Sequence, residues 1–565
     1  DPPRLANLTA MAMVWWVPSV ALGTVAATAM VTCLVRGRQA TTMGTWDWWL
    51  ITGVLHIPYL VVALFLMLGL IERVGYLWRG RPPSPPGQLR DVYPTVAVQL
   101  PMFNEHAVAE RIITAACAMT WPKARLTIQV LDDSTDPDTR TLVDGVCERM
   151  RRERGVDVRV LRREDRQGYK AGALEAARRA TDAEFIVIFD ADFVPTEDFL
   201  VRAMPHFFTA DGTPDTELVL VQTQWGHLNP AQSRLTAAQS LWVDDHHTLQ
   251  MSWRSAMWRF VNFTGTAGVW RASAIEAVGG WRATSLVEDC ELSFRQLFAG
   301  RRTAFVKEIV VPAELPATYT AYKAQQRRWT RGWMQLQRLH LLTLLVRYRC
   351  GPIRRIALLY HMCIPWQWAA WAVWALVLPL LIYTGHWLGA LGPLVGAVFY
   401  LLPAALFAIA ITTLATVEAR HTYPGPRSVG VLASRMRRLI PFLILNTGMI
   451  AHQFSAVVEG LFGEMHGEFE RTPKAAATDG GRAATTAKRY RVKIHWTYVL
   501  AEGFFVIYQI AAALLLLSAG FGWAAAGAVY LAGCVLFVAL YYGDDAGKRI
   551  FVVDRAALSR LVGAR

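Results

Sequence analysis

Two short acidic groups lie in the middle of the chain, and the second has residue types and a spacing that could bind a metal ion. Asp132–Asp136 (Asp-Asp-Ser-Thr-Asp) and Asp190–Asp192 (Asp-Ala-Asp) each follow a short apolar run. Two carboxylates at i and i+2 beyond a strand can hold a hard divalent cation through oxygen ligands. Such a cation can stabilise the charge that develops on a departing diphosphate. The first group has an equally good structural explanation, in which it is a polar turn and Asp136 caps the helix that follows.

A third acidic pair, Glu288 and Asp289, follows a loop that contains Gly279, Gly280 and Trp281. A hydroxyl nucleophile needs a general base within hydrogen-bond reach, and either carboxylate could serve. The alternative is that both are acidic residues at the start of a helix, where the helix dipole favours negative charge.

Basic and aromatic residues accompany these acids. The run Gln325–Trp329 (Gln-Gln-Arg-Arg-Trp) combines arginines, which can bind diphosphate oxygens through paired hydrogen bonds, with a flat aromatic face. The same run is also typical of an amphipathic helix at a membrane surface. Lys170, within Gly168–Gly172, opens a predicted helix and could contact a diphosphate, although an ordinary solvated lysine would look the same.

Strands and helices must alternate to position these groups. Alternation of this kind predicts βαβ units and a mostly parallel sheet. In open α/β sheets, ligands bind beyond the carboxyl ends of the strands, where the first two acidic groups lie. The predicted strands are 95–100, 126–131, 156–161 and 185–189, and the predicted helices are 105–119, 139–152 and 170–180.

Apolar residues are concentrated towards the two ends of the chain. The 565 residues are 53% hydrophobic and 18% charged, and the apolar excess lies before about residue 72 and after about residue 355. Apolar stretches of about 20 residues can each cross a bilayer. We therefore expect an α/β domain flanked by a helical membrane region with about six spans. The candidate spans are 11–35, 48–71, 355–383, 388–417, 498–520 and 523–542, with 440–462 as a further apolar segment.

The formal net charge of +14 comes from lysines and arginines that lie beside the apolar segments. They form no nucleic-acid-binding motif, so nucleic acid is not an expected partner. They suit an anionic membrane leaflet and an anionic nucleotide ligand. The basic loops 418–438 and 464–497 should both be cytosolic, so the polar-interrupted segment 440–462 should be re-entrant or interfacial. A seventh crossing is the alternative. The seven cysteines form no CxxC pair, which argues against a zinc site or a disulfide framework.

Taken in order, the motifs resemble those of the membrane-embedded family 2 glycosyltransferases. The resemblance is particularly to the cellulose synthase-like mannan synthases and their bacterial relatives, and it covers about residues 90–475. It rests on the runs PMFNE, DDSTD, GYKAG, FDAD, VQTQW, FTGTAGVWR, GGW, VED, AELPATYTAYKAQQRRW and ERTPK. It implies the GT-A fold, a Rossmann-like, mostly parallel α/β domain. We expect a transmembrane pair with its linker at 1–89, the GT-A domain at 90–316, interfacial helices at 317–354, and a transmembrane region at 355–565 with the re-entrant or interfacial segment at 439–463.

The resemblance also implies a role for each candidate residue. Asp289, with Glu288 beside it, would be the catalytic base, and Asp190 and Asp192 would hold Mg²⁺ or Mn²⁺. The donor-binding residues would be Pro101, Asn104, Glu105, Asp133, Lys170, Asp190 and Arg328. The acceptor-binding residues would be Phe263, Thr264, Gly265, Thr266, Gln325 and Trp329.

The expected activity is that of an inverting, metal-dependent, processive hexosyltransferase in the cell membrane, with its catalytic domain in the cytosol. It would use UDP-glucose or GDP-mannose to build a β-1,4-linked glucan- or mannan-type polysaccharide and translocate it across the membrane. Trp366, Trp368, Trp371 and Trp374 could line a sugar channel or face lipid.

Another activity remains open: transfer of one sugar to a membrane lipid, as in ceramide glucosyltransferases. A transporter or receptor with an inactive α/β domain is disfavoured, because every expected carboxylate is present.

About twenty residues follow residue 542, too few for a cyclic-di-GMP-binding PilZ domain, and no FxVTxK gating motif is evident. Regulation by that messenger is therefore not expected, and cellulose itself is a less favoured product.

Overall fold

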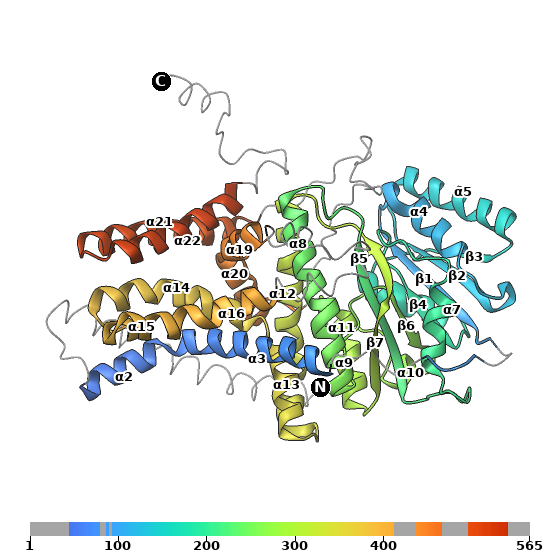
Figure 1. The fold of residues 1–565 in the computed structure, drawn as a ribbon. Coiled ribbons are helices and arrows are strands. Elements are labelled where there is room, and N and C mark those ends of the chain that lie inside the picture. Colours follow the sequence, from blue (N-terminus) through green and yellow to red (C-terminus); the bar gives the residue numbers. More distant parts are fainter. Residues whose placement is uncertain are drawn as a thin grey trace, which may run out of the picture.

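The computed structural model describes residues 45–79, 86–89, 93–411, 437, 439–465 and 495–540. The predicted span 11–35, the ERTPK run and nearly all of the two basic loops lie outside these residues. The described residues form an α/β domain beside a bundle of long helices (Figure 1).

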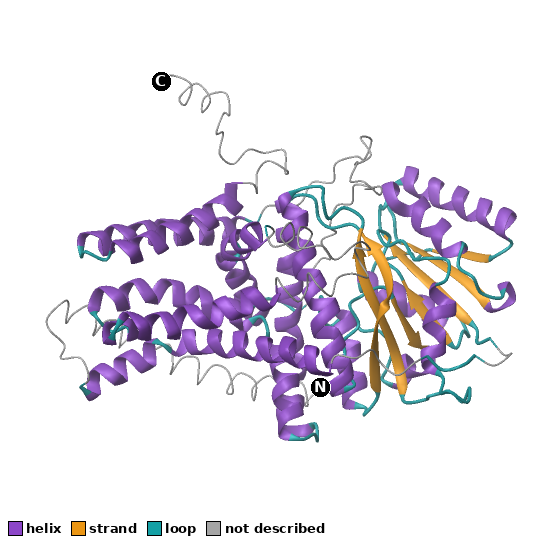
Figure 2. Ribbon diagram, in the orientation of Figure 1, coloured by secondary structure: helices purple, strands orange, loops and turns teal. Residues whose placement is uncertain are grey.

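A seven-stranded sheet forms the centre of the α/β domain (Figure 2), with the strand order β3-β2-β1-β4-β6-β5-β7. The strands are β1 (Val96–Met102), β2 (Leu126–Asp132), β3 (Asp157–Leu161), β4 (Phe185–Ile188), β5 (Leu218–His227), β6 (Gly268–Arg271) and β7 (Arg302–Ala313). β1 to β4 pair in parallel, as do β5 and β7, whereas β6 is antiparallel to both β4 and β5. The predicted mostly parallel α/β sheet is confirmed, and all four predicted strands are present.

Alternating strand side chains fill an apolar layer on each face of the sheet. Val96 and Val98 of β1 pack in one layer, and Ile186 and Ile188 of β4 pack in the other. Helices cover both layers, as expected for a mostly parallel sheet. The helices of the first layer are α4 (His106–Cys117) and α5 (Pro137–Arg154), and those of the second are α6 (Tyr169–Arg179), α10 (Ala272–Ala277) and α11 (Glu288–Phe298).

Five helical segments of the described chain are long and apolar enough to cross a membrane. They are Ile57–Trp78, Trp366–Leu391, Pro393–Ala410, Trp496–Ser518 and Gly522–Leu540. Their main helices are α3 (Ile57–Arg79), α14 (Trp366–Thr384), α16 (Leu402–Ala410), α21 (Trp496–Ser518) and α22 (Gly522–Leu540). A further apolar pair, α19 (Leu439–Gly448) and α20 (Ile450–Phe462), is bent by 46° at its break. The predicted interruption of 440–462 is therefore present, and its path through the membrane stays a prediction.

Two predicted spans have the wrong limits. The segment 48–71 is divided between α2 (Trp46–Leu55) and α3, and the candidate span starts at residue 57. Pro58 lies in the first turn of α3, where proline starts a helix readily because its missing N–H costs nothing there. Likewise, 355–383 is divided between α13 (Pro352–Cys363) and α14, with Pro365 just before α14.

The helix α12 (Tyr319–Leu342) lies between the sheet domain and the long helices (Figure 1). It begins at Thr318, whose hydroxyl accepts a hydrogen bond from the Ala321 amide at 3.3 Å. Because α12 carries the Gln325–Trp329 run, the fold brings this run to the junction between the two regions. The domain limits at residues 90, 317 and 355 stay predictions.

Candidate active site

A cavity of about 200 Å³ lies beyond the carboxyl ends of β1, β2, β4, β5 and β7. This is the edge at which the sequence predicts ligand binding. Most of the predicted site residues line it: Pro101, Glu105, Asp133, Lys170, Asp190, Asp192, Thr264, Gly265, Glu288, Asp289, Gln325, Arg328 and Trp329. The fold thus gathers residues from seven separate motifs around one space.

Three predicted site residues lie behind the wall of this cavity. The Asn104 side-chain oxygen accepts hydrogen bonds from the Thr135 and Asp136 amides at 2.9 and 3.0 Å, so it fastens the loops after β1 and β2 together. Phe263 is fully buried in the second apolar layer. The Thr266 hydroxyl accepts a hydrogen bond from the Asp190 amide at 2.9 Å. Contact of these three residues with a ligand stays a prediction; here they support residues that line the cavity.

Asp190 and Asp192 follow β4 and face the cavity together with Lys170. The Lys170 ammonium donates hydrogen bonds to an Asp190 carboxylate oxygen at 2.6 Å and to the Gly265 carbonyl at 2.9 Å. Both aspartates offer the hard oxygen ligands that Mg²⁺ and Mn²⁺ prefer. Among the described residues no group of three His, Cys, Asp or Glu side chains could hold a metal. The donor set therefore fits a cation of the Mg²⁺ type, which takes one or two carboxylates and completes its shell with substrate phosphates and water.

Glu288 and Asp289 form the first turn of α11 and are buried beside Lys170. Burial raises the pKa of Glu288 to about 7, the neighbouring Asp289 carboxylate adds to the increase, and Lys170 opposes it. Burial likewise raises the pKa of Asp289, again against Lys170. Burial acts to lower the pKa of Lys170, but Asp190, Glu288 and Asp289 outweigh it and raise that pKa. The result is a carboxylate cluster around one ammonium group, with pKa values shifted towards those of a general base.

Gly265 allows this close approach of charges. Its φ of +85° is in the left-handed region, and a Cβ there would lie 3.0 Å from Asp289 Oδ2 and 3.5 Å from Lys170 Nζ. A side chain at 265 would therefore be strained and would crowd both charged groups.

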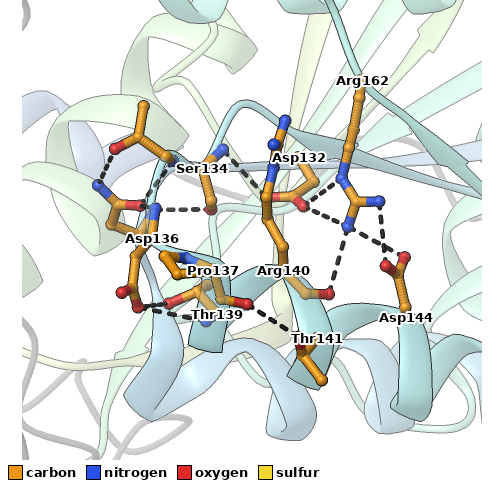
Figure 3. A network of polar contacts seen from close by, with 11 residues as sticks. Asp132, Ser134, Asp136, Pro137, Thr139, Arg140, Thr141, Asp144 and Arg162 are labelled. Atoms are coloured by element: carbon orange, nitrogen blue, oxygen red, sulfur yellow. Dashed lines mark hydrogen bonds and ion pairs between the residues drawn. The ribbon is translucent and has the colours of Figure 1, made fainter.

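The acidic group after β2 has a different environment (Figure 3). Asp132 accepts hydrogen bonds from the Ser134 amide at 3.1 Å and from Arg162 Nε at 2.9 Å. Asp136 accepts one from the Thr139 amide at 3.2 Å, which confirms its predicted role as the cap of α5. Asp133 is the member of the group that lines the cavity, and it pairs with Arg163.

The Gln325–Trp329 run places its residues on two sides of α12. Gln325, Gln326, Arg328 and Trp329 line the cavity. Arg327 instead bonds Glu459 of α20 through two nitrogens, at 2.9 and 2.6 Å. One side of this helix thus faces the site, and another is fastened to the bundle.

A second cavity of about 200 Å³ lies against the first and extends among the long helices. The two cavities share lining residues: Trp225, Trp242, Val243, Thr264, Val287, Asp289, Tyr322, Gln326 and Trp329. Beyond them, the second cavity is lined by Trp368 of α14, Phe407 of α16, Asn446 of α19 and Gln453 of α20. It also contains Arg73 and Arg254, which are neutralised by buried ion pairs with Asp245 and Glu72 respectively. Both arginines thus have acidic partners, and the space beside Asp289 and Trp329 leads towards the bundle.

The four tryptophans of α14 have different surroundings. Trp368 lines the second cavity, and Trp371 stacks beside it with ring centroids 6.3 Å apart. Trp366 donates a hydrogen bond to Gln337 Oε1 at 2.8 Å, and Trp374 packs among tyrosines. A cavity-lining place is thus observed for Trp368 alone of the four.

Comparison with known proteins gives the domain its family. Residues 94–332 match the family described as glycosyltransferase like family 2. Residues 94–332, which contain the whole seven-stranded sheet, are therefore similar to family 2 glycosyltransferases. Glucomannan 4-beta-mannosyltransferase 2 of Arabidopsis thaliana is 37% identical over 297 residues, which are 51% of this chain and 54% of the relative. Probable glucomannan 4-beta-mannosyltransferase 2 of Oryza sativa subsp. japonica is 41% identical over 271 residues, 47% of this chain and 46% of the relative. The chain spans about half the length of these curated relatives.

Among solved structures, the domain is similar to the mannosyltransferase PcManGT from Pyrobaculum calidifontis in complex with GDP-Man and Mn²⁺. The TM-score is 0.46 at 19% identity, covering 71% of this chain and 98% of that one. The family match and these relatives make residues 94–332 similar to family 2 glycosyltransferases of the mannan synthase-like kind, and the mostly parallel sheet agrees with the α/β fold expected for them.

The two cavities also contain residues to which the sequence patterns assigned no role. Trp225 and Tyr322 belong to quoted motifs, VQTQW and TAYKAQQRRW, so these motifs were the available signal. Trp242 and the arginines Arg73 and Arg254 lie outside every quoted motif. Arg73 and Arg254 meet their acidic partners 172 and 182 residues away along the chain, so no local pattern marks them.

Proposed function

We propose that this chain is a processive β-glycosyltransferase of the cell membrane, with its catalytic domain in the cytosol. It takes hexose from GDP-mannose or UDP-glucose, extends a β-1,4-linked mannan- or glucan-type polysaccharide, and passes the polymer through the bundle. The observation that carries the proposal is the pair of adjoining cavities. Asp289 and Trp329 stand in the wall of both, so a glycan whose end lies at Asp289 has a way towards the long helices.

The transfer step assigns the proton to Asp289. Its carboxylate takes the proton of the acceptor hydroxyl while the hydroxyl oxygen forms the new bond to the donor C1. The bond from C1 to the phosphate oxygen breaks on the opposite side, and the nucleoside diphosphate leaves with that electron pair. An α-linked donor thus becomes a β-linked product. The raised pKa of Asp289 supports this role, because a base close to neutrality accepts the proton more readily.

The donor would occupy the first cavity. Asp133, Pro101 and Glu105 lie near the carboxyl ends of β1 and β2 and would contact the nucleoside. Lys170 and Arg328 would pair with the diphosphate, Lys170 by turning from Asp190 towards the phosphate oxygens. Asp190 and Asp192 would hold Mg²⁺ or Mn²⁺, and the bound cation supplies positive charge for the departing diphosphate.

The acceptor would lie between the two cavities. Trp329 has an aromatic face suited to the C–H face of a sugar ring, and Gln325, Thr264 and Gly265 line the same space. The paired state of Arg73 and Arg254 favours a neutral occupant of the second cavity, because neither arginine has charge left for an anion. A neutral polyhydroxyl chain meets that requirement.

Donor screening tests the proposal. Purified protein in lipid nanodiscs is incubated with GDP-mannose, UDP-glucose and UDP-N-acetylglucosamine, each with Mg²⁺ or Mn²⁺, and the products are sized by mass spectrometry. We expect a ladder of products from a hexose donor that a β-1,4-specific mannanase or glucanase degrades. A product of one sugar on a lipid would support the lipid-glycosylating alternative. Failure of every donor to yield transfer would refute the proposed activity.

Translocation needs a separate measurement. The protein is reconstituted into sealed vesicles, and the donor is added outside. Only protein whose catalytic domain faces outward can reach the donor and make the product. We expect a fraction of polymer that resists external glycanase until detergent is added. Polymer that is fully degraded without detergent would leave transfer intact and refute translocation.

A further inference from the structure

Gln335 of α12 connects the loop that carries the carboxylate pair to the end of another helix. Its side-chain oxygen accepts a hydrogen bond from the Leu286 amide at 2.9 Å, and its side-chain nitrogen donates one to the Glu464 carbonyl at 3.0 Å. The Gln335 side chain itself is fully buried, and both of its partners are part-buried at the bond. A buried amide that lost these partners would leave backbone groups unsatisfied on two segments that are far apart in the chain.

The loop before α11 is held by packing as well as by Gln335. Val287, the residue before α11, is buried in an apolar cluster with Phe260 and Leu336, but its side chain has no polar atom with which to cap the helix. Leu286 lies three residues before Asp289, so the bond from Gln335 holds the backbone that enters the helix just ahead of Glu288 and Asp289. Gly332 adds a close packing contact, because a Cβ at that position would lie 2.5 Å from Val287 Cγ1. α12 therefore approaches this loop closely at one point and bonds it at another, one turn apart.

The same face of α12 also binds the C-terminal end of α20. Arg338 donates to the Gly463 carbonyl at 2.7 Å and to the Gly460 carbonyl at 3.2 Å, and Arg331 donates to the Glu464 carbonyl at 3.0 Å. Residues 331, 335 and 338 follow the i, i+4, i+7 spacing of one helix face. The carbonyls that end a helix lack partners within it, and these side chains supply them. Gln335 is the member of this set whose other end reaches the loop before α11.

We propose that Gln335 is a positioning residue for sugar transfer: it fixes Asp289 relative to the acceptor and makes that placement depend on the end of α20. The inference rests on the proposed function, because it acts through Asp289 as the base. Movement of α20 relative to α12 would then reach the base through a single side chain. Misplacing a reacting group by about 1 Å can cost about 10²-fold in rate, so a small shift is enough.

The test compares Gln335→Leu with a matched control, Gln337→Leu. Gln337 is also a buried amide of α12. It donates to the Met362 carbonyl at 3.1 Å and to the Met334 sulfur at 3.4 Å and accepts from Trp366 at 2.8 Å, and none of these bonds reaches the loop before α11. We expect Gln335→Leu to lower kcat about 10²-fold with the donor KM changed less than about twofold. Gln337→Leu should lower the unfolding temperature about as much as Gln335→Leu does, but should leave kcat within about twofold of wild type.

A double-variant measurement separates positioning from general destabilisation. In an Asp289→Asn background the base is already lost, so Gln335→Leu should cause little further loss of kcat, whereas a merely structural effect would reduce kcat by the same factor in both backgrounds. Gln335→Glu keeps an acceptor for the Leu286 amide and should retain more activity than Gln335→Leu. This variant preserves the test if Gln335→Leu does not fold.

The outcomes distinguish this inference from the proposed function. If wild type transfers sugar and Asp289→Asn does not, the proposed base stands. Equal kcat for Gln335→Leu and Gln337→Leu would then overturn the role of Gln335 alone. An Asp289→Asn variant with full turnover would overturn the base assignment, and the inference with it, without any Gln335 variant.

Discussion

Two sets of acidic residues have different surroundings in the structure. In the turn after β2, which we call the β2 turn (Asp132–Asp136), carboxylates are matched with nearby donors. Asp132 meets Arg162 and Asp136 meets the Thr139 amide of α5 (Figure 3). Asp133 meets Arg163. In the carboxylate pocket, which we define as Asp190, Asp192, Glu288 and Asp289, three carboxylates act on the single ammonium of Lys170.

The difference lies in the cationic partners: Asp132 and Asp133 of the β2 turn each meet an arginine, whereas three carboxylates of the pocket share Lys170. A carboxylate that is paired within the protein contributes to stability and has little to offer a ligand. Burial raises the pKa values of Glu288 and Asp289, so these two carboxylates gain when a proton or a cation arrives nearby. The β2 turn should therefore respond to mutation mainly through stability, and the carboxylate pocket mainly through catalysis. Asp133 joins the two, because it belongs to the turn and also lines the donor cavity.

The largest effect is expected at the proposed base. Asp289→Asn keeps the shape of the side chain and removes its ability to accept a proton, so kcat should fall by about 10³-fold, within the range that general bases contribute. Donor KM should stay close to wild type, because the shape of the side chain is kept. The unfolding temperature should also stay close to wild type, because the neutral amide that replaces the carboxylate costs no charge burial. Turnover is measured by release of nucleoside diphosphate. An undiminished kcat would place Asp289 with the structural cluster instead.

Metal dependence is the second way to test the pocket. Chelation should abolish transfer, and Mn²⁺ or Mg²⁺ should restore it. Asp192→Asn should lower kcat by about 10²-fold, since a bound cation supplies several kcal/mol of charge stabilisation. The matched control is Asp198→Asn, an exposed aspartate on the same segment that pairs with Arg202 and lines neither cavity. If both variants behave alike at saturating metal, Asp192 does not hold the cation.

Sequence patterns predict the first four strands of the sheet but not the last three, and the reason is physical. The first four strands and the helices between them follow from alternation, since each strand is an apolar run with a local boundary. β5, β6 and β7 were not predicted. β5 is buried along most of its length yet contains Gln222, Thr223 and Gln224, whose polarity hides the strand from any pattern of apolar residues. Their partners, such as the Thr266 and Ala267 carbonyls that Gln222 binds, lie in distant parts of the chain.

The same limit applies to the sites. The cap by Asp136 is a contact over three residues, so local rules suggest it. The meeting of Lys170 with Asp190 and Asp289 depends on sheet order and on Gly265, and only the resemblance to a family indicated it beforehand. The link from Gln335 to Leu286 spans 49 residues and leaves no local pattern at all.

Within the β2 turn, substitution of Asp132 should cause the largest loss of stability. This side chain is fully buried and bonds the more exposed Arg162, so Asp132→Asn should cost about 2 kcal/mol of unfolding free energy. At a temperature where the variant is folded, kcat should stay within about twofold of wild type. Asp144, which meets the same Arg162 from an exposed position, is the control, and Asp144→Asn should cost less than about 1 kcal/mol. Thermal unfolding followed by circular dichroism measures both.

The smallest effect is expected at Asp136, and it tests whether the turn is purely structural. Asp136 accepts hydrogen bonds from the Thr139 amide and, at 2.6 Å, from the Thr139 hydroxyl, and so it caps α5 (Figure 3). Asp136→Ala should lower the free energy of unfolding by about 1 kcal/mol, whereas Asp136→Asn should restore most of it, because asparagine is an equally good cap. Neither change should alter kcat at a permissive temperature. A loss of kcat in Asp136→Asn, with stability preserved, would mean that the charge of this aspartate acts on the donor. The β2 turn would then belong in part to the catalytic machinery, and the contrast between the clusters would be one of degree.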